Sequence, residues 1–384
     1  MFKRLLSLVS LLMITCSSLT NAWANPPQLQ AQSAILLDAK TGQILYEKSS
    51  HQRRAPASTT KVLTALLAIE SGRLDEITTV SIQAASTPGS TLQLYAGQQI
   101  SLRELLTGLL LRSGNDAAVA IAEHLAGSVT AFAELMNQKA YLIGARESHF
   151  VNPHGLSRPN HYTTAYDLAI ITRYALQNPT FAELVNTKET QIDWLDRQGH
   201  EQDRFLRNTN KLLWMFEEAD GVKTGTTGIA GPCLVSSATR DNQKLIAVVL
   251  HDASRWYDSM KLLKYGFDTF DLIDYAAADD VVATVAVDKG MTERLDALAS
   301  LPASLVVAAT DSSAVTVECN VPETIKAPIY RGQKIGEIVF FVHNQAVKTV
   351  DVVASQDVNE KTLENLFFEQ LLRTYRLFSR WGTI

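Results

Sequence analysis

The sequence is poor in cysteine and has no excess of positive charge. Its 384 residues contain three cysteines, Cys16, Cys233 and Cys319, too few for a disulfide framework, so we expect Cys233 and Cys319 to be unpaired thiols. Lys and Arg total 35 against 40 Asp and Glu, and this balance argues against a nucleic-acid partner, which favours a basic surface. With 46% hydrophobic and 20% charged residues, the chain is not disordered and is long enough for two domains.

The first 24 residues have the pattern of a secretory signal peptide. Lys3 and Arg4 precede the short apolar run Leu5–Ile14, and Ala22 and Ala24 supply small residues around a cleavage site after residue 24. An uncleaved anchor is the alternative, but the run is short for a membrane span. We therefore expect residues 1–24 to be a signal peptide and the protein to be exported to the periplasm or cell-wall space.

Residues 25–275 predict an α+β domain. Apolar runs on both sides of a glycine-bearing turn indicate a hairpin over 35–46, and residues 221–250 indicate an antiparallel meander. The helical patterns cover residues 59–71, 102–111, 117–125, 163–174 and 260–267. Helices between an initial hairpin and a final meander predict one antiparallel sheet, assembled from both ends of the domain and flanked by helices.

The remainder of the chain changes character. Short valine-rich runs separated by turn residues predict a small all-β domain over 276–358. Residues 359–384 predict an amphipathic helix with an apolar face. Leu363, Leu366, Phe367, Leu371, Tyr375 and Phe378 form that face. We expect this helix to anchor the protein peripherally at the outer face of the cytoplasmic membrane; packing against the β-domain is the alternative.

The first of three short motifs is Ser58-Thr59-Thr60-Lys61. Lys61 follows Ser58 by one turn at the start of a predicted buried helix, which brings its amine within reach of the Ser58 hydroxyl. A serine hydroxyl is a weak nucleophile until a base takes its proton, and a lysine in a dry pocket is such a base. Ser58 as a plain helix cap is the alternative, but it leaves the buried lysine unexplained.

The other two motifs are Ser113-Gly114-Asn115 and Lys223-Thr224-Gly225. Asn115 either caps the helix that follows it or bonds both Lys61 and a substrate amide, with Ser113 as a proton relay. Lys223 and Thr224 offer donors for a carboxylate, and Gly225 lets a substrate backbone approach the strand closely.

Lys40-Thr41-Gly42 repeats the third motif in the tip of the first predicted hairpin. Its residues are explained by the turn alone. We therefore interpret this copy as structural.

The ordered motifs, together with Asn152-Pro153-His154-Gly155-Leu156, resemble the penicillin-recognising serine enzymes. Within that group the chain is most similar to the D-alanyl-D-alanine carboxypeptidases of the low-molecular-mass penicillin-binding proteins, peptidase family S11. The resemblance extends over essentially the whole chain. It implies a β-lactamase/transpeptidase-like domain, peptidoglycan stem peptides as substrate, β-lactams as covalent inhibitors, and no cofactor or metal.

The resemblance also implies a role for each site residue. Ser58 is acylated by the penultimate D-Ala carbonyl, Lys61 is the general base, Ser113 returns the proton to the leaving D-Ala, and Asn115 holds the peptide. The residues implied in substrate binding are Lys223, Thr224, Gly225, Thr226 and Arg255. Among them, Lys223, Thr224 and Arg255 bind the terminal carboxylate, and the Thr226 N–H joins that of Ser58 in an oxyanion hole.

Several alternatives remain at this point. His149, His154 and His161 crowd one segment, but their spacing fits no zinc motif. Glu183-Leu184-Val185-Asn186 is one residue too short for the deacylating loop of class A β-lactamases, so we expect poor β-lactam hydrolysis. A D,D-endopeptidase acting on cross-linked stems and a non-catalytic penicillin-binding sensor are the other functions left open.

Overall fold

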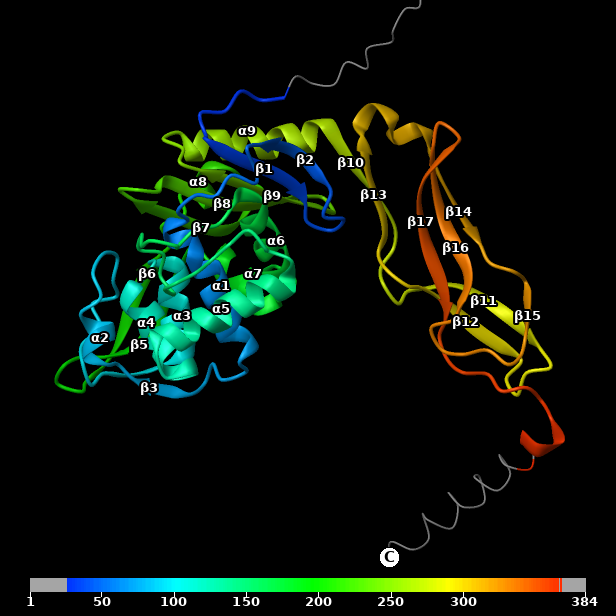
Figure 1. Cartoon of the computed structure of the whole chain (residues 1–384), viewed down its shortest axis with the longest axis horizontal. Helices are drawn as coiled ribbons and strands as arrows, with labels where there is room; N and C mark the ends of the chain where they lie inside the picture. The colour runs from blue at the N-terminus through cyan, green and yellow to red at the C-terminus, as the bar shows by residue number, and fades with distance from the viewer. Residues whose placement is uncertain (1–25, 366, 368–384) are drawn as a thin grey trace, which may run out of the picture.

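The computed structural model describes residues 26–365 and residue 367. The predicted signal peptide, residues 1–24, lies outside the described residues, and so does most of the helix predicted over 359–384. The chain forms a mixed α/β part, coloured blue to green in Figure 1, followed by an all-β part in yellow to orange. This arrangement agrees with the predicted catalytic and C-terminal β-domains.

A five-stranded antiparallel sheet forms the centre of the first part, with strand order β2-β1-β9-β8-β7. Its strands are β1 (Ser33–Asp38), β2 (Ile44–Lys48), β7 (Ala219–Thr227), β8 (Gly231–Arg240) and β9 (Gln243–Leu250). In the register of β1 against β9, Ala34 lies opposite Val249. The predicted hairpin and meander are confirmed, and the sheet does join both ends of the domain.

The sheet is covered on both faces, which explains why β1 and β9 are continuous apolar runs. Ile35 and Leu37 face the core that contains most of the helices, whereas Ala34 and Leu36 face the core formed with the last helix. Figure 1 shows α9 on one side of the sheet and α1 and α3 to α7 on the opposite side, whereas Leu212 of α8 belongs to the core that contains α9. The helices are η1 (Ala57–Thr60), α1 (Lys61–Glu70), α2 (Ile82–Ala85), α3 (Leu102–Leu111), α4 (Asn115–Ala126), α5 (Val129–Ile143), α6 (Ala165–Ala175), α7 (Pro179–Asn186), α8 (Leu212–Met215) and α9 (Arg255–Thr269).

The first residues of two helices can be compared with the starts that the sequence predicts. Helix α3 has the predicted bounds, and a capping box between Ser101 and Glu104 fixes its first turn. The helix predicted from residue 59 instead begins at Lys61, after the 3-10 turn η1. No side-chain cap bond is made at either helix start there, so the alternative interpretation of Ser58 as a helix cap is wrong.

Two short antiparallel pairs complete the first part. They are β3 (Ile77–Thr79) with β4 (Gln99–Ser101), and β5 (Glu189–Leu195) with β6 (Glu201–Arg207). The β5–β6 hairpin was not predicted from the sequence. Its last residues lead directly toward β7 through α8.

The all-β part has a six-stranded sheet, with strand order β14-β16-β17-β12-β11-β15, and a separate pair β10-β13. Its elements are β10 (Phe270–Ala276), β11 (Val281–Asp288), β12 (Arg294–Ala299), β13 (Ala303–Ala308), η2 (Ala309–Ala314), β14 (Val315–Asn320), β15 (Thr324–Lys326), β16 (Lys334–Val342) and β17 (Gln345–Ala354). The strand β10 spans the boundary that we predict between the domains 25–275 and 276–358. The position of that boundary stays a prediction.

Among the described residues, no single helix has both the length and the apolar composition needed to cross a membrane; α4 and α5 meet these criteria only as a pair bent by 84°.

Candidate active site

Ser58 and Lys61 lie where η1 passes into α1, against the face of the central sheet. The Lys61 Nζ is 3.0 Å from the Ser58 Oγ, and the Lys61 side chain has no exposed surface. The S-x-x-K spacing therefore brings the two groups into hydrogen-bond contact, as predicted. A primary amine touching a hydroxyl inside a dry site is an arrangement suited to proton transfer.

Two carbonyl-type oxygens complete the surroundings of the Lys61 Nζ. The Asn115 Oδ1 and the His154 backbone oxygen each lie 2.7 Å from it. Burial lowers the pKa of Lys61 well below its usual range, and the nearby positive charge of Lys223 lowers it further, while Asp116 acts in the opposite direction. These effects favour the neutral amine over the ammonium.

Asn115 is the first residue of α4 and not its cap, which is Gly114. Its side-chain amide is held between two partners, because the Nδ2 donates to the Pro88 oxygen at 2.7 Å while the Oδ1 accepts from Lys61. Its backbone N–H donates to the Ser90 oxygen at 2.7 Å. The alternative role of Asn115 as a cap is therefore wrong.

Ser113 lies between α3 and α4, and it is buried with a left-handed backbone φ of 62°. Lys61 already contacts Ser58, Asn115 and His154. These three partners occupy the hydrogen-bonding capacity of its amine. Ser113 is therefore only two residues from Asn115 in the sequence but makes no hydrogen bond with Lys61.

Strand β7, at one edge of the sheet, carries the third motif. Lys223 is 1% exposed, and its Nζ donates to the Thr224 backbone oxygen at 3.1 Å. Burial lowers the pKa of Lys223 to about 7, and the Arg255 guanidinium contributes in the same direction. The Thr224 Oγ1 is 3.4 Å from that of Thr209.

Gly225 is the point where β7 meets the serine. A Cβ added there would lie 2.7 Å from the Ser58 backbone N, so only glycine allows this approach. One residue on, the Thr226 Oγ1 accepts from the Arg255 Nη1 at 2.8 Å, and the same nitrogen donates to the Gly225 oxygen at 2.8 Å. Arg255, on α9, therefore binds the end of the strand that carries the motif.

The segment after α5 packs against η1, the turn that contains Ser58. Gly155 has a φ of +89°, and a Cβ there would lie 1.8 Å from the Ala57 oxygen. The Asn152 side chain accepts from the Gly155 N–H at 2.7 Å and donates to the Leu156 oxygen at 2.9 Å. This loop presents the His154 carbonyl to Lys61. Sequence reasoning missed that role because a backbone carbonyl has no residue-type signal.

The histidines of this segment have other roles than metal binding in the described structure. The His161 ring contacts the Thr60 hydroxyl at 3.0 Å and accepts from the Val151 N–H at 3.0 Å. Burial lowers the pKa of His161 to about 4 and that of His154 to about 3, with smaller contributions from nearby positive groups. Both rings are thus neutral near pH 7 and serve the packing of the loop.

The remaining sequence candidates do not supply the chemistry considered for them. Glu183–Asn186 is part of helix α7, which is not a loop that presents a carboxylate to water. Cys233 and Cys319 are free, as predicted.

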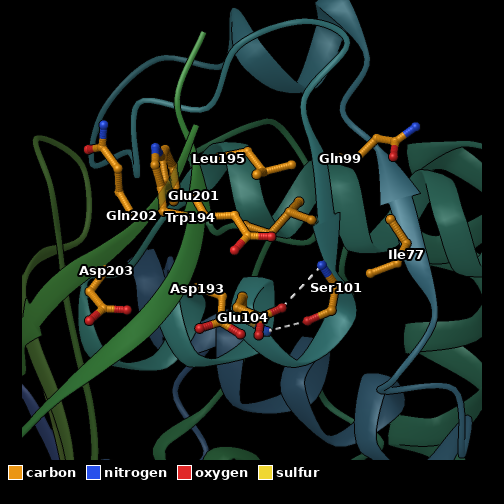
Figure 2. A pocket seen from close by; sticks show the side chains of 11 residues that line it. Ile77, Gln99, Ser101, Glu104, Asp193, Trp194, Leu195, Glu201, Gln202 and Asp203 are labelled. Carbon is orange, nitrogen blue, oxygen red and sulfur yellow. Dashed lines mark hydrogen bonds between the residues drawn. The ribbon is translucent and has the colours of Figure 1, made fainter. Parts of the chain in front are cut away.

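A cavity of about 570 Å³ lies beside the tip of the β5–β6 hairpin (Figure 2). Four acidic residues are among those lining it: Glu104, Asp193, Glu201 and Asp203. Figure 2 shows Glu104 bonded to Ser101, the pair that caps α3. None of the predicted site residues lines this cavity.

Two family models match the chain. One, described as D-alanyl-D-alanine carboxypeptidase, matches residues 20–254, and another, described as the C-terminal domain of penicillin-binding protein 5, matches residues 270–360. Together they account for most of the described residues.

Individual proteins are similar over comparable lengths. D-alanyl-D-alanine carboxypeptidase DacF of Bacillus subtilis (strain 168) is 35% identical over 341 residues, 86% of either chain. D-alanyl-D-alanine carboxypeptidase DacD of Escherichia coli (strain K12) is 32% identical over 355 residues, which are 88% of this chain and 89% of that one. The crystal structure of penicillin binding protein 5 from Haemophilus influenzae superposes with a TM-score of 0.74 at 30% identity, covering 87% of this chain and 99% of that one.

Proposed function

The chain belongs to the D-alanyl-D-alanine carboxypeptidase family. From that premise we propose that Ser58 is the nucleophile that the substrate acylates. The family activity is that of a serine peptidase that removes the terminal D-alanine of peptidoglycan stem peptides through an acyl-enzyme and binds penicillin. The observation that supports Ser58 most strongly is its contact with the buried amine of Lys61.

Lys61 is the general base in this proposal. A neutral amine has two N–H donors and one lone pair. The Asn115 Oδ1 and the His154 oxygen accept both donors, which leaves the lone pair for the Ser58 O–H. The lowered pKa of Lys61 supports the neutral form that this arrangement needs.

The proton follows a closed path. The Ser58 oxygen attacks the penultimate D-Ala carbonyl as its proton passes to Lys61, and the tetrahedral oxyanion forms. As the C–N bond breaks, the proton passes from Lys61 to the departing D-Ala amine with Ser113 as the relay, a step that requires Lys61 to exchange its contact with the acylated Ser58 oxygen for one with Ser113. Water then hydrolyses the ester, with Lys61 taking its proton and returning it to Ser58.

The rest of the site binds two negative charges, the terminal carboxylate of the substrate and the oxyanion of the tetrahedral intermediate. Lys223 and Thr224 face the terminal carboxylate, and Arg255 adds positive charge while bonding the β7 end at Thr226. The N–H groups of Ser58 and Thr226 form the oxyanion hole. The contact distance at Gly225, which keeps β7 against the Ser58 backbone, supports that assignment.

The wider role follows from the substrate. Trimming of the terminal D-Ala removes a donor for cross-linking, so the enzyme limits peptidoglycan cross-links. Export fits the homologues, and we include peripheral membrane anchoring by residues 359–384 in the proposal because of their apolar pattern. Slow β-lactam hydrolysis is expected, since Glu183 lies in helix α7.

The test uses a D-Ala-D-Ala peptide and the Ser58→Ala variant. We expect the wild-type protein to release D-Ala and to be labelled covalently by fluorescent penicillin, and Ser58→Ala to lose both. A Ser313→Ala variant, which makes the same change at an exposed position of η2 in the all-β part, is the control and should retain both activities.

Three outcomes would contradict the proposal. Labelling without peptide turnover indicates a sensor, loss of activity with a chelator indicates a metal peptidase, and release only from cross-linked dimers indicates an endopeptidase.

A further inference from the structure

A second, smaller cleft of about 250 Å³ lies at the other end of the β5–β6 hairpin. Its walls are the segment Thr91–Gln93, the strand residues Arg204–Arg207, and Arg112 at the end of α3. Three of its eight lining residues are arginines and none is acidic. We refer to this cleft, lined by Arg112, Arg204 and Arg207, as the arginine cleft.

The segments that line the arginine cleft continue into the active site. Arg112 directly precedes Ser113, and the Ser90 oxygen next to Thr91 accepts the N–H of Asn115 at 2.7 Å. The other wall continues from Arg207 to Thr209, whose hydroxyl contacts that of Thr224. A peptide bound at Ser58 can therefore extend a short distance into the cleft.

The positive charge of the cleft is only partly compensated. Arg207 pairs with Glu189 at 3.3 Å, but both side chains are exposed, so this pair is weak. Arg204 stacks on Trp194, and burial lowers its pKa, opposed by Asp116 and assisted by Arg112. The carboxylate of Asp116 is already occupied by the N–H groups of Leu92 and Leu94.

The two cavities beside the hairpin have linings of opposite charge. The tip borders the cavity lined by Glu104, Asp193, Glu201 and Asp203 (Figure 2), whereas the base borders the arginine cleft. An anionic group beside the active site is therefore attracted to the base and repelled from the tip. Guanidinium groups match a carboxylate with paired hydrogen bonds.

We propose that the arginine cleft binds a carboxylate carried by the acyl-donor peptide, upstream of its D-Ala-D-Ala end. This rests on the proposed function and adds a second anion site to it. The terminal carboxylate is assigned to the β7 end near Arg255, and the arginine cleft lies on the α3–α4 side of the site. An acidic stem peptide can then be recognised at both positions.

The test compares matched peptides that end in D-Ala-D-Ala and differ only by Glu or Gln. Three pairs place this residue one, two or three positions before the D-Ala-D-Ala, and kcat/KM is measured for each from D-Ala release. In the pair with the best register we expect the Glu peptide to be favoured about fivefold or more. Arg112→Gln should reduce that ratio to within about twofold of one.

Arg103→Gln is the control, because Arg103 lies on the same helix but pairs with Asp75 at its other end. It removes the same charge and should keep the wild-type ratio. The ratio is internal, so a general loss of activity in Arg112→Gln does not alter its meaning. Added salt should lower the ratio in the wild-type protein.

Two results would overturn the inference: a ratio near one for all three pairs in the wild-type protein, or an unchanged ratio in Arg112→Gln. Either can occur while D-Ala is released normally, which leaves the proposed function intact. If none of the six peptides releases D-Ala, the proposed function fails and this inference fails with it.

Discussion

The tripeptide Lys-Thr-Gly occurs twice in this chain, at residues 40–42 and 223–225, and the two copies have little in common beyond their letters. Lys40 lies at the surface and pairs with Asp274, whereas Lys223 is 1% exposed and has a pKa lowered to about 7. The first copy turns a hairpin and the second lies in an edge strand beside Ser58. The surroundings, not the side chains, give the second copy its chemistry.

The glycines of the two copies are required for different reasons. Gly42 has a φ of +76°, which a turn demands, and its neighbours there are atoms of the flexible Arg173 side chain. Gly225 needs no unusual φ, but its missing Cβ makes room for the Ser58 backbone. One glycine is a conformational requirement and the other is a steric one.

Removing the lysines should separate the copies most strongly. We expect Lys223→Ala to lower kcat/KM for a D-Ala-D-Ala peptide by roughly 30-fold to several-thousand-fold, since a buried charge pair with the substrate carboxylate is worth about 2–5 kcal/mol. Lys40→Ala should leave kcat/KM unchanged, because its ion pair with Asp274 is at the surface. Equal effects of the two changes on D-Ala release would contradict the assignment of Lys223.

Adding a methyl group to each glycine should give crossed effects. Gly225→Ala pushes a Cβ against the Ser58 N–H, and a displacement of about 1 Å costs roughly 100-fold in turnover. Gly42→Ala should keep activity but lose about 1–2 kcal/mol of unfolding free energy, because alanine is strained at that φ. Steady-state kinetics and thermal unfolding of both variants check this; full activity in Gly225→Ala would show that β7 does not press on Ser58.

The pH dependence of acylation should respond to only one of the lysines. Lys61 must be neutral, so the penicillin acylation rate falls as pH drops through the pKa of Lys61. The positive charge of Lys223 lowers the pKa of Lys61. The Lys223→Met change removes that charge and so raises the pKa of Lys61. The fall of the acylation rate on the acid side of the pH profile should therefore move to higher pH. Lys40→Met is the control, and an identical limb in both variants would rule out the coupling.

The threonines should show the smallest difference. Thr224→Val removes one hydroxyl facing the substrate carboxylate, and we expect kcat/KM to fall about three- to tenfold. Thr41→Val removes the bond from its Oγ1 to the Asp38 carboxylate, which should cost about 1 kcal/mol of stability and no activity. Chemical denaturation and D-Ala release measured together distinguish the two results.

Much of the fold could be predicted because its signals are local. The bounds of α3 follow from Ser101, Glu104 and an apolar pattern, and the central sheet follows from its continuous apolar runs. The β5–β6 hairpin was missed because its strands are rich in charged residues such as Glu189, Asp193 and Asp203, which strands disfavour. The α9 helix begins five residues earlier than predicted, since its first five residues contain no aliphatic side chain that would extend the helical apolar pattern.

The site could be predicted as a set of side chains but not as a geometry. Ser58, Lys61 and Asn115 were found through their motifs, and the structure brings all three together. The third partner of Lys61 is the His154 carbonyl, and the partner of Asn115 is the Pro88 carbonyl. Every residue has a carbonyl, so only the tertiary fold determines which one is used.

The pairing of β1 with β9 has a consequence for the order of folding. Ser33–Asp38 can pair early with β2, but its other edge has no partner until Gln243–Leu250 has been synthesised, so more than half of the chain is made while one edge of β1 stays open. Such a contact between distant segments is slow to form. Until it forms, the hydrophobic strand β1 is open to association with other chains. We therefore expect refolding of this domain to be limited by closure of the sheet, and truncation before residue 243 to leave an aggregation-prone product.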